Sequence, residues 1–393
     1  MNGRALLMLS WLYLILQSGT AAQNVVIAVI DGSRDSETMG AGYTPMMWDS
    51  LRPQGTVWTD FRNEGITSTN PGHASIATGT WQTIENEGNE RPTMPTVFEY
   101  YRSSSSAAET DVYVVTGKYK LDVLSYSTHP SYGEPYGASV SLAPMDGLVL
   151  NAVLSVMGGH HPKIVIINFP DVDYAGHDAD WERYLVAIRT VDSLVYLLWQ
   201  FIQTNPHYKD NTTLFITNDH GRHDDGHGGF KDHGDGCEGC RHILLLAVGR
   251  GFPAGRVVAA TRTQIDMAPT VGELLSFPVP YAEGNSLLAD TLQTAFVDEP
   301  MSAGVAQDFA LHQNYPNPFN PTTAIGFSLP VRTHVELEIL NTLGERIALL
   351  VNSVKGPGAH MVSFDGEGLA GGIYLYRLRA GHYSETKTMH LLR

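Results

Sequence analysis

The chain has 393 residues, more than one compact core usually holds, so two domains are expected. An apolar fraction of 43% is ordinary for a globular protein and excludes a largely disordered chain. The formal net charge of −16 argues against a nucleic-acid backbone or an anionic membrane as the main partner, because both attract clustered Lys and Arg.

Residues 1–22 have the pattern of a secretory signal peptide. Arg4 precedes the apolar run Ala5–Leu16, which is too short to span a bilayer, and the small residues ending at Ala22 predict cleavage before Gln23. A buried N-terminal helix is the alternative, but it requires neither the basic residue nor the small ones. No later segment has the length and apolarity of a membrane span, so we expect no transmembrane segment in the mature chain.

Residues 23–290 are predicted to form an open, mostly parallel α/β sheet with helices on both faces. Helical periodicity is clearest over Asp180–Thr204, before Pro206. Continuous apolar runs are typical of strands that are buried on both faces. Five such runs are the predicted strands: Asn24–Ile30, Val112–Thr116, Lys163–Asn168, Thr212–Thr217 and His242–Val248.

The composition changes after about Leu292. Residues 291–308 are predicted to be a linker, and residues 309–393 a small all-β sandwich. There Val335, Leu337 and Ile339 alternate with glutamates, which is the period-two pattern of strands with one solvent-facing side.

Acidic residues follow three of the predicted strands. Because ligands bind beyond the carboxyl ends of the strands in open α/β sheets, we expect their side chains to converge with two nearby histidines. The residues are Asp31, Asp173, His177, Asp219 and His220. Carboxylates with imidazoles suit zinc or a similar divalent metal, and five ligands exceed the needs of one zinc ion. A single Asp at a strand end could instead cap the next helix. Three separate strands that each end in Asp are hard to explain as helix caps.

The segment Thr67–Gly79 offers a nucleophile. Residues His73–Gly79 have the pattern of a helix start, which places Thr69 at or just before the helix N-terminus, where free N–H groups and the helix dipole favour anions. A metal ion could activate the Thr69 hydroxyl. The alternative is that Thr69 only caps the helix.

Residues 25–287 resemble the alkaline phosphatase superfamily, within it the nucleotide pyrophosphatase/phosphodiesterase-like branch. The resemblance rests on motifs in the family's order: Asp31 after a strand, Thr69-Asn70-Pro71-Gly72-His73, Asp173-Tyr174-Ala175-Gly176-His177, Asn218-Asp219-His220-Gly221, and Ile265–Thr270 with Gly272–Leu275. It implies two divalent metal ions, with zinc expected, and hydrolysis of phosphate mono- or diesters through a phospho-threonine.

The resemblance also implies ligand sets. One metal ion would be held by Asp31, Asp219 and His220, with Thr69 adjacent as the nucleophile. The other would be held by Asp173, His177 and a later histidine. For that histidine we favour His233, while His227 and His242 stay open, and Asp171 is a weaker rival of Asp173.

Substrate contacts are also implied by the resemblance. The family holds a phosphate oxygen with an Asn, for which Asn86 and Asn89 are candidates. Lys118 and Lys120 resemble the Lys-x-Arg pair of superfamily monoesterases, although a second Lys lacks the fork of Arg. The alternative is a solvated surface loop.

The only cysteines are Cys237 and Cys240. In an oxidising compartment they could form a local disulfide, or they could remain two free thiols. They could also be half of a zinc site, but the sequence has no second Cys pair.

The segment Leu311–Thr323 resembles the opening of the sorting domains of the type IX secretion system, and Asn341–Glu345 and Leu369–Tyr374 agree with it. The resemblance implies recognition by that export machinery and a secreted or cell-surface location. An accessory sandwich that binds carbohydrate or protein is the alternative.

The sequence thus predicts a secreted two-metal phosphoesterase acting on a small-molecule phosphate ester. One alternative is a sulfate or phosphonate ester hydrolase of the same superfamily, and another is an inactive surface binding protein. A sulfatase is disfavoured, because sulfatases use a modified Cys or Ser in a Cys/Ser-x-Pro-x-Arg segment. In this chain the candidate nucleophile is Thr69, and both cysteines lie far from it in the sequence.

Overall fold

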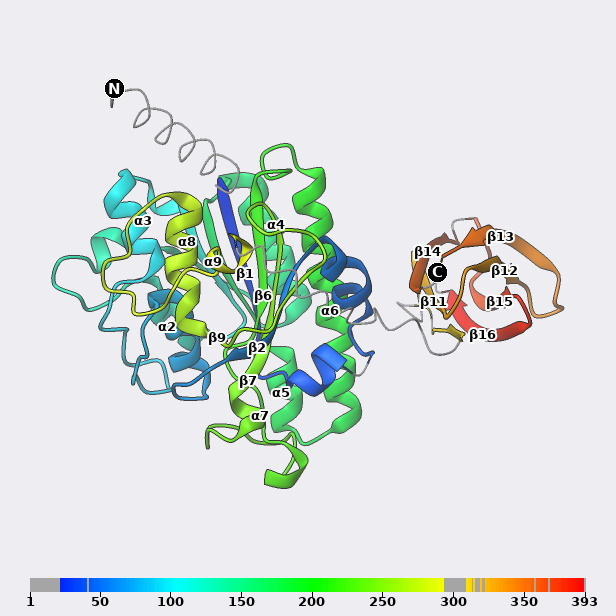
Figure 1. The fold of residues 1–393 in the computed structure, drawn as a ribbon, viewed down its shortest axis with the longest axis horizontal. Coiled ribbons are helices and arrows are strands. Elements are labelled where there is room, and N and C mark those ends of the chain that lie inside the picture. The colour runs from blue at the N-terminus through cyan, green and yellow to red at the C-terminus, as the bar shows by residue number, and fades with distance from the viewer. Residues whose placement is uncertain are drawn as a thin grey trace, which may run out of the picture. The chain divides into compact units, whose positions relative to one another are not determined.

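The computed structural model describes residues 22–292 and 309–391, except 41, 313, 315–318, 320–321, 357 and 367. The chain forms two compact units, Met1–Thr294 and Ala295–Arg393, which we describe separately (Figure 1). Nearly all of the predicted signal peptide and linker lies outside the described residues, as does most of the Asn314–Pro321 opening of the sorting domain.

The first unit is built on a nine-stranded, largely parallel sheet, which confirms the predicted fold class. The strand order is β4-β3-β5-β1-β6-β7-β2-β8, with β9 beside β2. Strand β7 runs antiparallel to both of its neighbours. The strands are β1 (Asn24–Ile30), β2 (Gly55–Arg62), β3 (Val112–Thr116), β4 (Ser139–Leu142), β5 (Ile164–Phe169), β6 (Thr212–Thr217), β7 (His242–Gly249), β8 (Arg256–Val258) and β9 (Arg262–Thr263).

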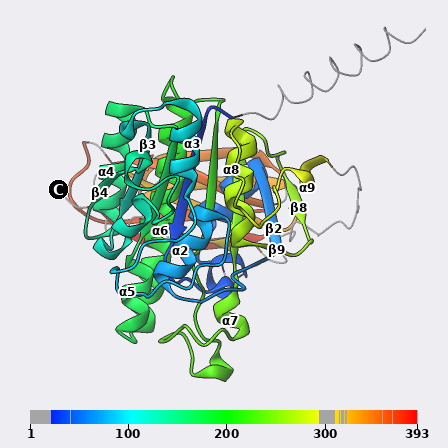
Figure 2. The same ribbon diagram turned by 90° about the vertical axis from the view of Figure 1, so that its left-hand side faces the viewer.

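Helices cover both faces of this sheet (Figures 1 and 2). The described helices are α2 (Thr69–Thr78), α3 (Val97–Ser105), α4 (Asp146–His160), α5 (Asp171–His177), α6 (Trp181–Thr204), α7 (Glu238–Arg241), α8 (Met267–Leu275) and α9 (Ala289–Leu292). The predicted helix 180–204 is α6, for which Asp180 is the N-cap.

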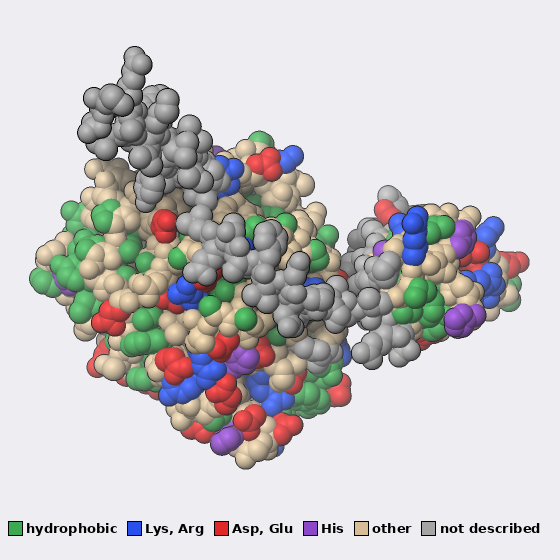
Figure 3. All heavy atoms as spheres, viewed as in Figure 1, with side chains coloured by type: hydrophobic (Ala, Val, Ile, Leu, Met, Phe, Trp, Pro, Cys, Tyr) green, Lys and Arg blue, Asp and Glu red, His purple; other side chains and the backbone are tan. Residues whose placement is uncertain are grey.

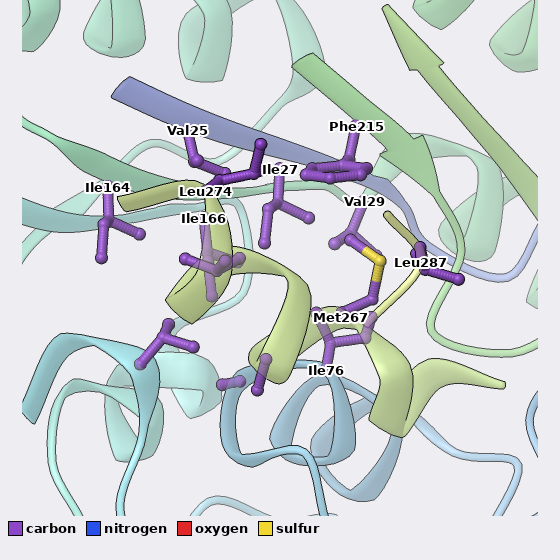
Figure 4. Packing of buried hydrophobic residues seen from close by; sticks show 14 of the residues in the cluster. Val25, Ile27, Val29, Ile76, Ile164, Ile166, Phe215, Met267, Leu274 and Leu287 are labelled. Atoms are coloured by element: carbon purple, nitrogen blue, oxygen red, sulfur yellow. The ribbon is translucent and has the colours of Figure 1, made fainter. Parts of the chain in front are cut away.

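Alternation along β1 divides the core into two layers. Val25, Ile27 and Val29 pack with residues of α2, α3 and α8, as Figure 4 shows for Ile76, Met267 and other labelled side chains. Val26, Ala28 and Ile30 pack on the opposite face with residues of α4, α5 and α6. Strand β1 is thus buried on both faces. Its carboxyl end lies at the edge of the sheet where ligands bind in such folds.

Helix α6 corrects one expectation. The sequence predicted no membrane-spanning segment after the signal peptide, but α6 is long and apolar enough to cross a membrane. Half of its most apolar 18-residue window is buried inside the protein. Its buried side chains, including Ile188, Val191 and Val195, pack against the sheet. A core helix of this kind meets the same length and apolarity criteria as a membrane span.

The second unit contains two antiparallel sheets that share one core. One consists of β10 (Ala310–Leu311), β11 (Thr322–Leu329) and β14 (Gly358–Asp365), and the other of β13 (Arg346–Lys355), β12 (Thr333–Leu340), β15 (Gly372–Ala380) and β16 (Tyr383–Leu391). Val335, Leu337 and Ile339 are buried, as the alternation predicts. Glu338 departs from the pattern, because it is buried and pairs with Arg377 at 2.6 Å.

Candidate active site

The metal-ligand candidates come from the carboxyl ends of three adjacent strands. Asp31 follows β1 directly, while α5 begins after β5 and carries Asp173 and His177 one helical turn apart, on the same face. Asp219 and His220 follow β6. Because β5, β1 and β6 are parallel neighbours, these side chains meet at one edge of the sheet.

The structure brings the first ligand set together. Asp31 Oδ1, Asp219 Oδ2 and His220 Nε2 are buried and have no hydrogen-bond partner among the described residues. His220 Nε2 lies 3.7 Å from Asp31 Oδ1 and 3.5 Å from Asp219 Oδ2. His220 Nδ1 is 2.8 Å from the Gly221 carbonyl; when it donates there, it leaves the Nε2 lone pair for a metal. Three buried ligand atoms that lie so close together and make no hydrogen bond to another described residue fit one divalent cation.

The second set is also assembled. Asp173 Oδ1 lies 3.5 Å from His177 Nε2 and 3.6 Å from His233 Nε2, and the two imidazole nitrogens are 3.2 Å apart. His233 Nδ1 faces the Thr67 carbonyl at 3.0 Å, so Nε2 is the nitrogen that faces Asp173 and His177. Burial, together with nearby His220, lowers the pKa of His233 to about 3, which keeps it neutral as a ligand must be.

The rival ligands lie elsewhere. His227 is exposed and pairs with Asp224 at 2.7 Å. His242 Nε2 lies 3.1 Å from the Thr59 carbonyl. Asp171 accepts a hydrogen bond from the backbone N–H of Asp146 at 3.2 Å. Among the histidines left open by the sequence, the structure therefore places His233 beside Asp173.

Lys118 lies inside the site, so the solvated-loop alternative is wrong for this residue. Its Nζ is 2.9 Å from Asp31 Oδ2, 2.6 Å from Asp173 Oδ2 and 3.3 Å from Thr69 Oγ1. Burial alone would lower the pKa of Lys118, but the charges of Asp31 and Asp173 outweigh it and raise the pKa. The side chain therefore stays a cation between two carboxylates.

Thr69 does not cap helix α2. The helix begins at Thr69, four residues before the predicted start, and its N-cap is Ser68. Pro71 fits there because a first-turn proline needs no intrahelical N–H partner. The Thr69 hydroxyl accepts a hydrogen bond from Lys118 instead, at the N-terminal end of the helix, where anions are favoured.

The substrate-contact candidates separate into two places. Asn86 Oδ1 accepts a hydrogen bond from the Asn70 N–H at 2.9 Å, and Lys120 Nζ donates to the Asn86 carbonyl at 3.0 Å. Both residues therefore lie beside the start of α2. Asn89 is exposed and lines a separate pocket with Trp81.

Three residues of the site were not assigned roles from the sequence. Asn168 Nδ2 donates to Asp31 Oδ2 at 2.7 Å, and His73 Nδ1 lies 3.1 Å from Asp219 Oδ2. Arg222 is fully buried and donates to both the carboxylate and the carbonyl of Asp173. Position could have signalled them, because each is within four residues of a predicted site residue or of a strand end.

Two motif glycines allow this close packing. A Cβ on Gly72 would lie 2.4 Å from the Asp219 carbonyl oxygen, and one on Gly176 would lie 2.3 Å from the Arg222 guanidinium. Real Cβ atoms do not approach that closely, so larger residues would push α2 and Arg222 away from the ligands. Glycine is therefore required at these two motif positions because no larger side chain fits there.

Comparison with known proteins agrees with this architecture. Residues 130–242 match the family described as the metalloenzyme superfamily, and residues 313–391 match the secretion system C-terminal sorting domain. The chain contains an alkaline phosphatase-like metalloenzyme domain and a type IX sorting domain. The predicted superfamily and the predicted sorting domain are therefore confirmed, and the sorting domain indicates a secreted or cell-surface location.

Individual relatives are more diverse. A sulfatase of Metarhizium majus (strain ARSEF 297) is 31% identical over 121 residues, which span 31% of this chain and 28% of that protein. A 2-O GAG sulfatase structure has a TM-score of 0.52 at 15% identity, covering 88% of this chain and 85% of its own. Murine ectonucleotide pyrophosphatase/phosphodiesterase 5, an inactive variant with AMP, has a TM-score of 0.51 at 12% identity, covering 67% and 97%. At these identities the structures support the fold alone.

The second ligand set can be tested by counting the zinc ions bound per chain. We expect His233→Ala to lose about one equivalent of tightly bound zinc, because the second site keeps only Asp173 and His177. His242→Ala is the matched control and should keep the full count. Elemental analysis of the dialysed proteins measures both, and an unchanged count in His233→Ala with a loss in His242→Ala would contradict the assignment.

Proposed function

We propose that the metalloenzyme domain is a two-metal phosphoesterase that transfers a phosphoryl group from an ester to Thr69 and then to water. The observation that carries the proposal is the position of the Thr69 hydroxyl. It lies at the first residue of α2, 3.3 Å from Lys118 Nζ, and Lys118 in turn touches a carboxylate of each ligand set.

Metal ions held by the two ligand sets, zinc being the expected ion, would supply Lewis-acid stabilisation of charge on the attacking and leaving oxygens. The chain's own groups orient the reaction. The Thr69 oxygen lies at the N-terminal end of α2, where the helix dipole favours an anion, and Lys118 donates to it. Asn86 and Lys120, beside the same helix start, are proposed to bind a phosphate oxygen.

The chemistry balances without a further reactant. The bond from Thr69 Oγ to phosphorus forms as the ester P–O bond breaks, and the released alkoxide leaves as the alcohol with the hydroxyl proton. Water then attacks phosphorus, and the Thr69 Oγ–P bond breaks. This step restores the free Thr69 hydroxyl and releases inorganic phosphate from a monoester, or a phosphate monoester from a diester.

A sulfate ester is the second candidate, because the Metarhizium majus relative is described as a sulfatase. The nucleophile argues against it: this chain has a threonine at the helix start where sulfatases resembling it have a Cys or Ser that is modified. Phosphonate esters are a further class to be compared. The sorting domain supports export by the type IX machinery, so the proposed small-molecule ester substrate would be met outside the cell or at its surface.

Removal of the nucleophile gives the first functional prediction. We expect Thr69→Ala to lower hydrolysis of para-nitrophenyl phosphate by on the order of 10³-fold or more, because alanine has no oxygen to accept the phosphoryl group. Thr69→Ser keeps an oxygen and should retain more activity. Steady-state rates on matched phosphate monoesters, phosphate diesters, phosphonate esters and sulfate esters measure this, and full activity of the alanine variant would refute the nucleophile.

Lys118 gives a prediction about the ester class. A monoester carries one more charged oxygen than a diester, so loss of the buried ammonium should weaken monoester hydrolysis selectively. We expect Lys118→Met to lower kcat/KM for the monoester by about 10- to 100-fold, and for the diester by less. Lys163→Met is the control, because Lys163 precedes β5 at the end of the strand away from the site. An unchanged monoester-to-diester ratio in Lys118→Met would contradict this role.

A further inference from the structure

A second cluster of metal-binding side chains lies outside the active site. His223, Asp235, Cys237 and Cys240 each offer one ligand atom, and these four atoms all lie within 4.8 Å of one another. The two sulfurs are 3.6 Å apart, Cys240 Sγ is 3.6 Å from Asp235 Oδ1, and His223 Nε2 is 3.2 Å from the same oxygen. His223 Nε2 is buried and has no hydrogen-bond partner in the described part of the chain.

These separations match a tetrahedral zinc site. Zinc–sulfur bonds of about 2.3 Å at tetrahedral angles place two sulfurs about 3.8 Å apart. A disulfide requires about 2.05 Å, and the structure has both cysteines as free thiols. The sequence suggested half a zinc site that lacked a second Cys pair; the folded chain supplies a histidine and a carboxylate in its place.

The backbone holds the cluster closed. The Gly221 N–H donates to the Cys240 carbonyl at 2.9 Å, and the His223 N–H donates to the Asp232 carbonyl at 2.9 Å. A Cβ on Gly239 would lie 2.5 Å from the Arg222 carbonyl oxygen, so the two ends of the loop between β6 and β7 pack directly on each other. Four protein ligands from both ends of one loop form the closed arrangement of a structural zinc site.

We propose that His223, Asp235, Cys237 and Cys240 bind a structural zinc ion that is separate from the two catalytic metal ions. The ion ties together the ends of the loop that carries Arg222 and His233, and so it holds both residues against Asp173. A neighbouring group, Asp224, His227 and Cys237, is less enclosed and contains only one thiol.

The cysteine content makes the test specific. Because the chain has only two cysteines, any thiolate-to-metal signal must involve Cys237 or Cys240. We expect the mature full chain loaded with Co²⁺ to show a thiolate-to-cobalt charge-transfer band in the near ultraviolet. The double variant Cys237→Ser/Cys240→Ser should lose the band and about one equivalent of metal, and His223→Gln should weaken it. His227→Gln and Asp173→Asn are the controls and should keep it.

A second measurement needs no variant. In the zinc-loaded wild-type protein we expect both thiols to resist Ellman's reagent, and to react at two per chain after zinc is removed with a chelator. The proposal is overturned if the wild-type protein shows no cobalt–thiolate band, if its cysteines are joined as a disulfide, or if they react equally fast before and after chelation. These outcomes do not depend on ester hydrolysis, so failure of the proposed function leaves the test intact.

Discussion

The active site depends on three buried carboxylates that share one edge of the sheet. Asp31, Asp173 and Asp219 are each at most 3% exposed. Burying charge in this way costs several kcal/mol per ion unless opposite charges compensate it. Lys118 and Arg222 supply two buried cations, and burial together with nearby Asp219 still raises the pKa of Asp31. Two divalent cations would complete the compensation and give this acidic protein a local field that attracts an anionic ester.

The loop between β6 and β7 connects the proposed active site with the proposed structural zinc site. In this loop Arg222 and His233 contact Asp173 of the active site. The same loop also carries the proposed zinc ligands His223, Asp235, Cys237 and Cys240. Figure 3 shows acidic, basic and histidine side chains close together near the end of the unit where α7 lies in Figure 1. A long irregular loop needs further contacts to keep a fixed geometry. The proposed zinc ion at the ends of this loop would supply them and would hold His233 in place, although His233 lies far from any strand.

The sequence predicted the framework well, because the relevant signals are local. Continuous apolar runs identified β1, β3 and β6 with their observed bounds, and Asp31 stands directly after the first of these. Strand β2 was missed because Thr56, Thr59 and Asp60 interrupt its apolar pattern. The antiparallel direction of β7 was not visible either, since pairing direction is set by distant partners.

Long-range contacts explain what the sequence could not resolve in the site. The burial of Lys118 between two carboxylates depends on three strands meeting, so a basic loop residue looked like a surface residue. The choice of His233 over His227 depends on how a long loop folds back over α5. The Cys237–Cys240 pair needed His223, which is distant enough in sequence that spacing alone did not suggest a shared site.

The central claim is that Thr69 becomes covalently phosphorylated during turnover. Acid quenching of the zinc-loaded enzyme with a phosphate monoester, followed by mass spectrometry of the peptide that contains Thr69, tests it most directly. We expect a phosphoryl adduct on Thr69 that forms with substrate and is absent without it. Turnover of phosphate esters with an unmodified Thr69 peptide, or an adduct that forms only with sulfate esters, would contradict it.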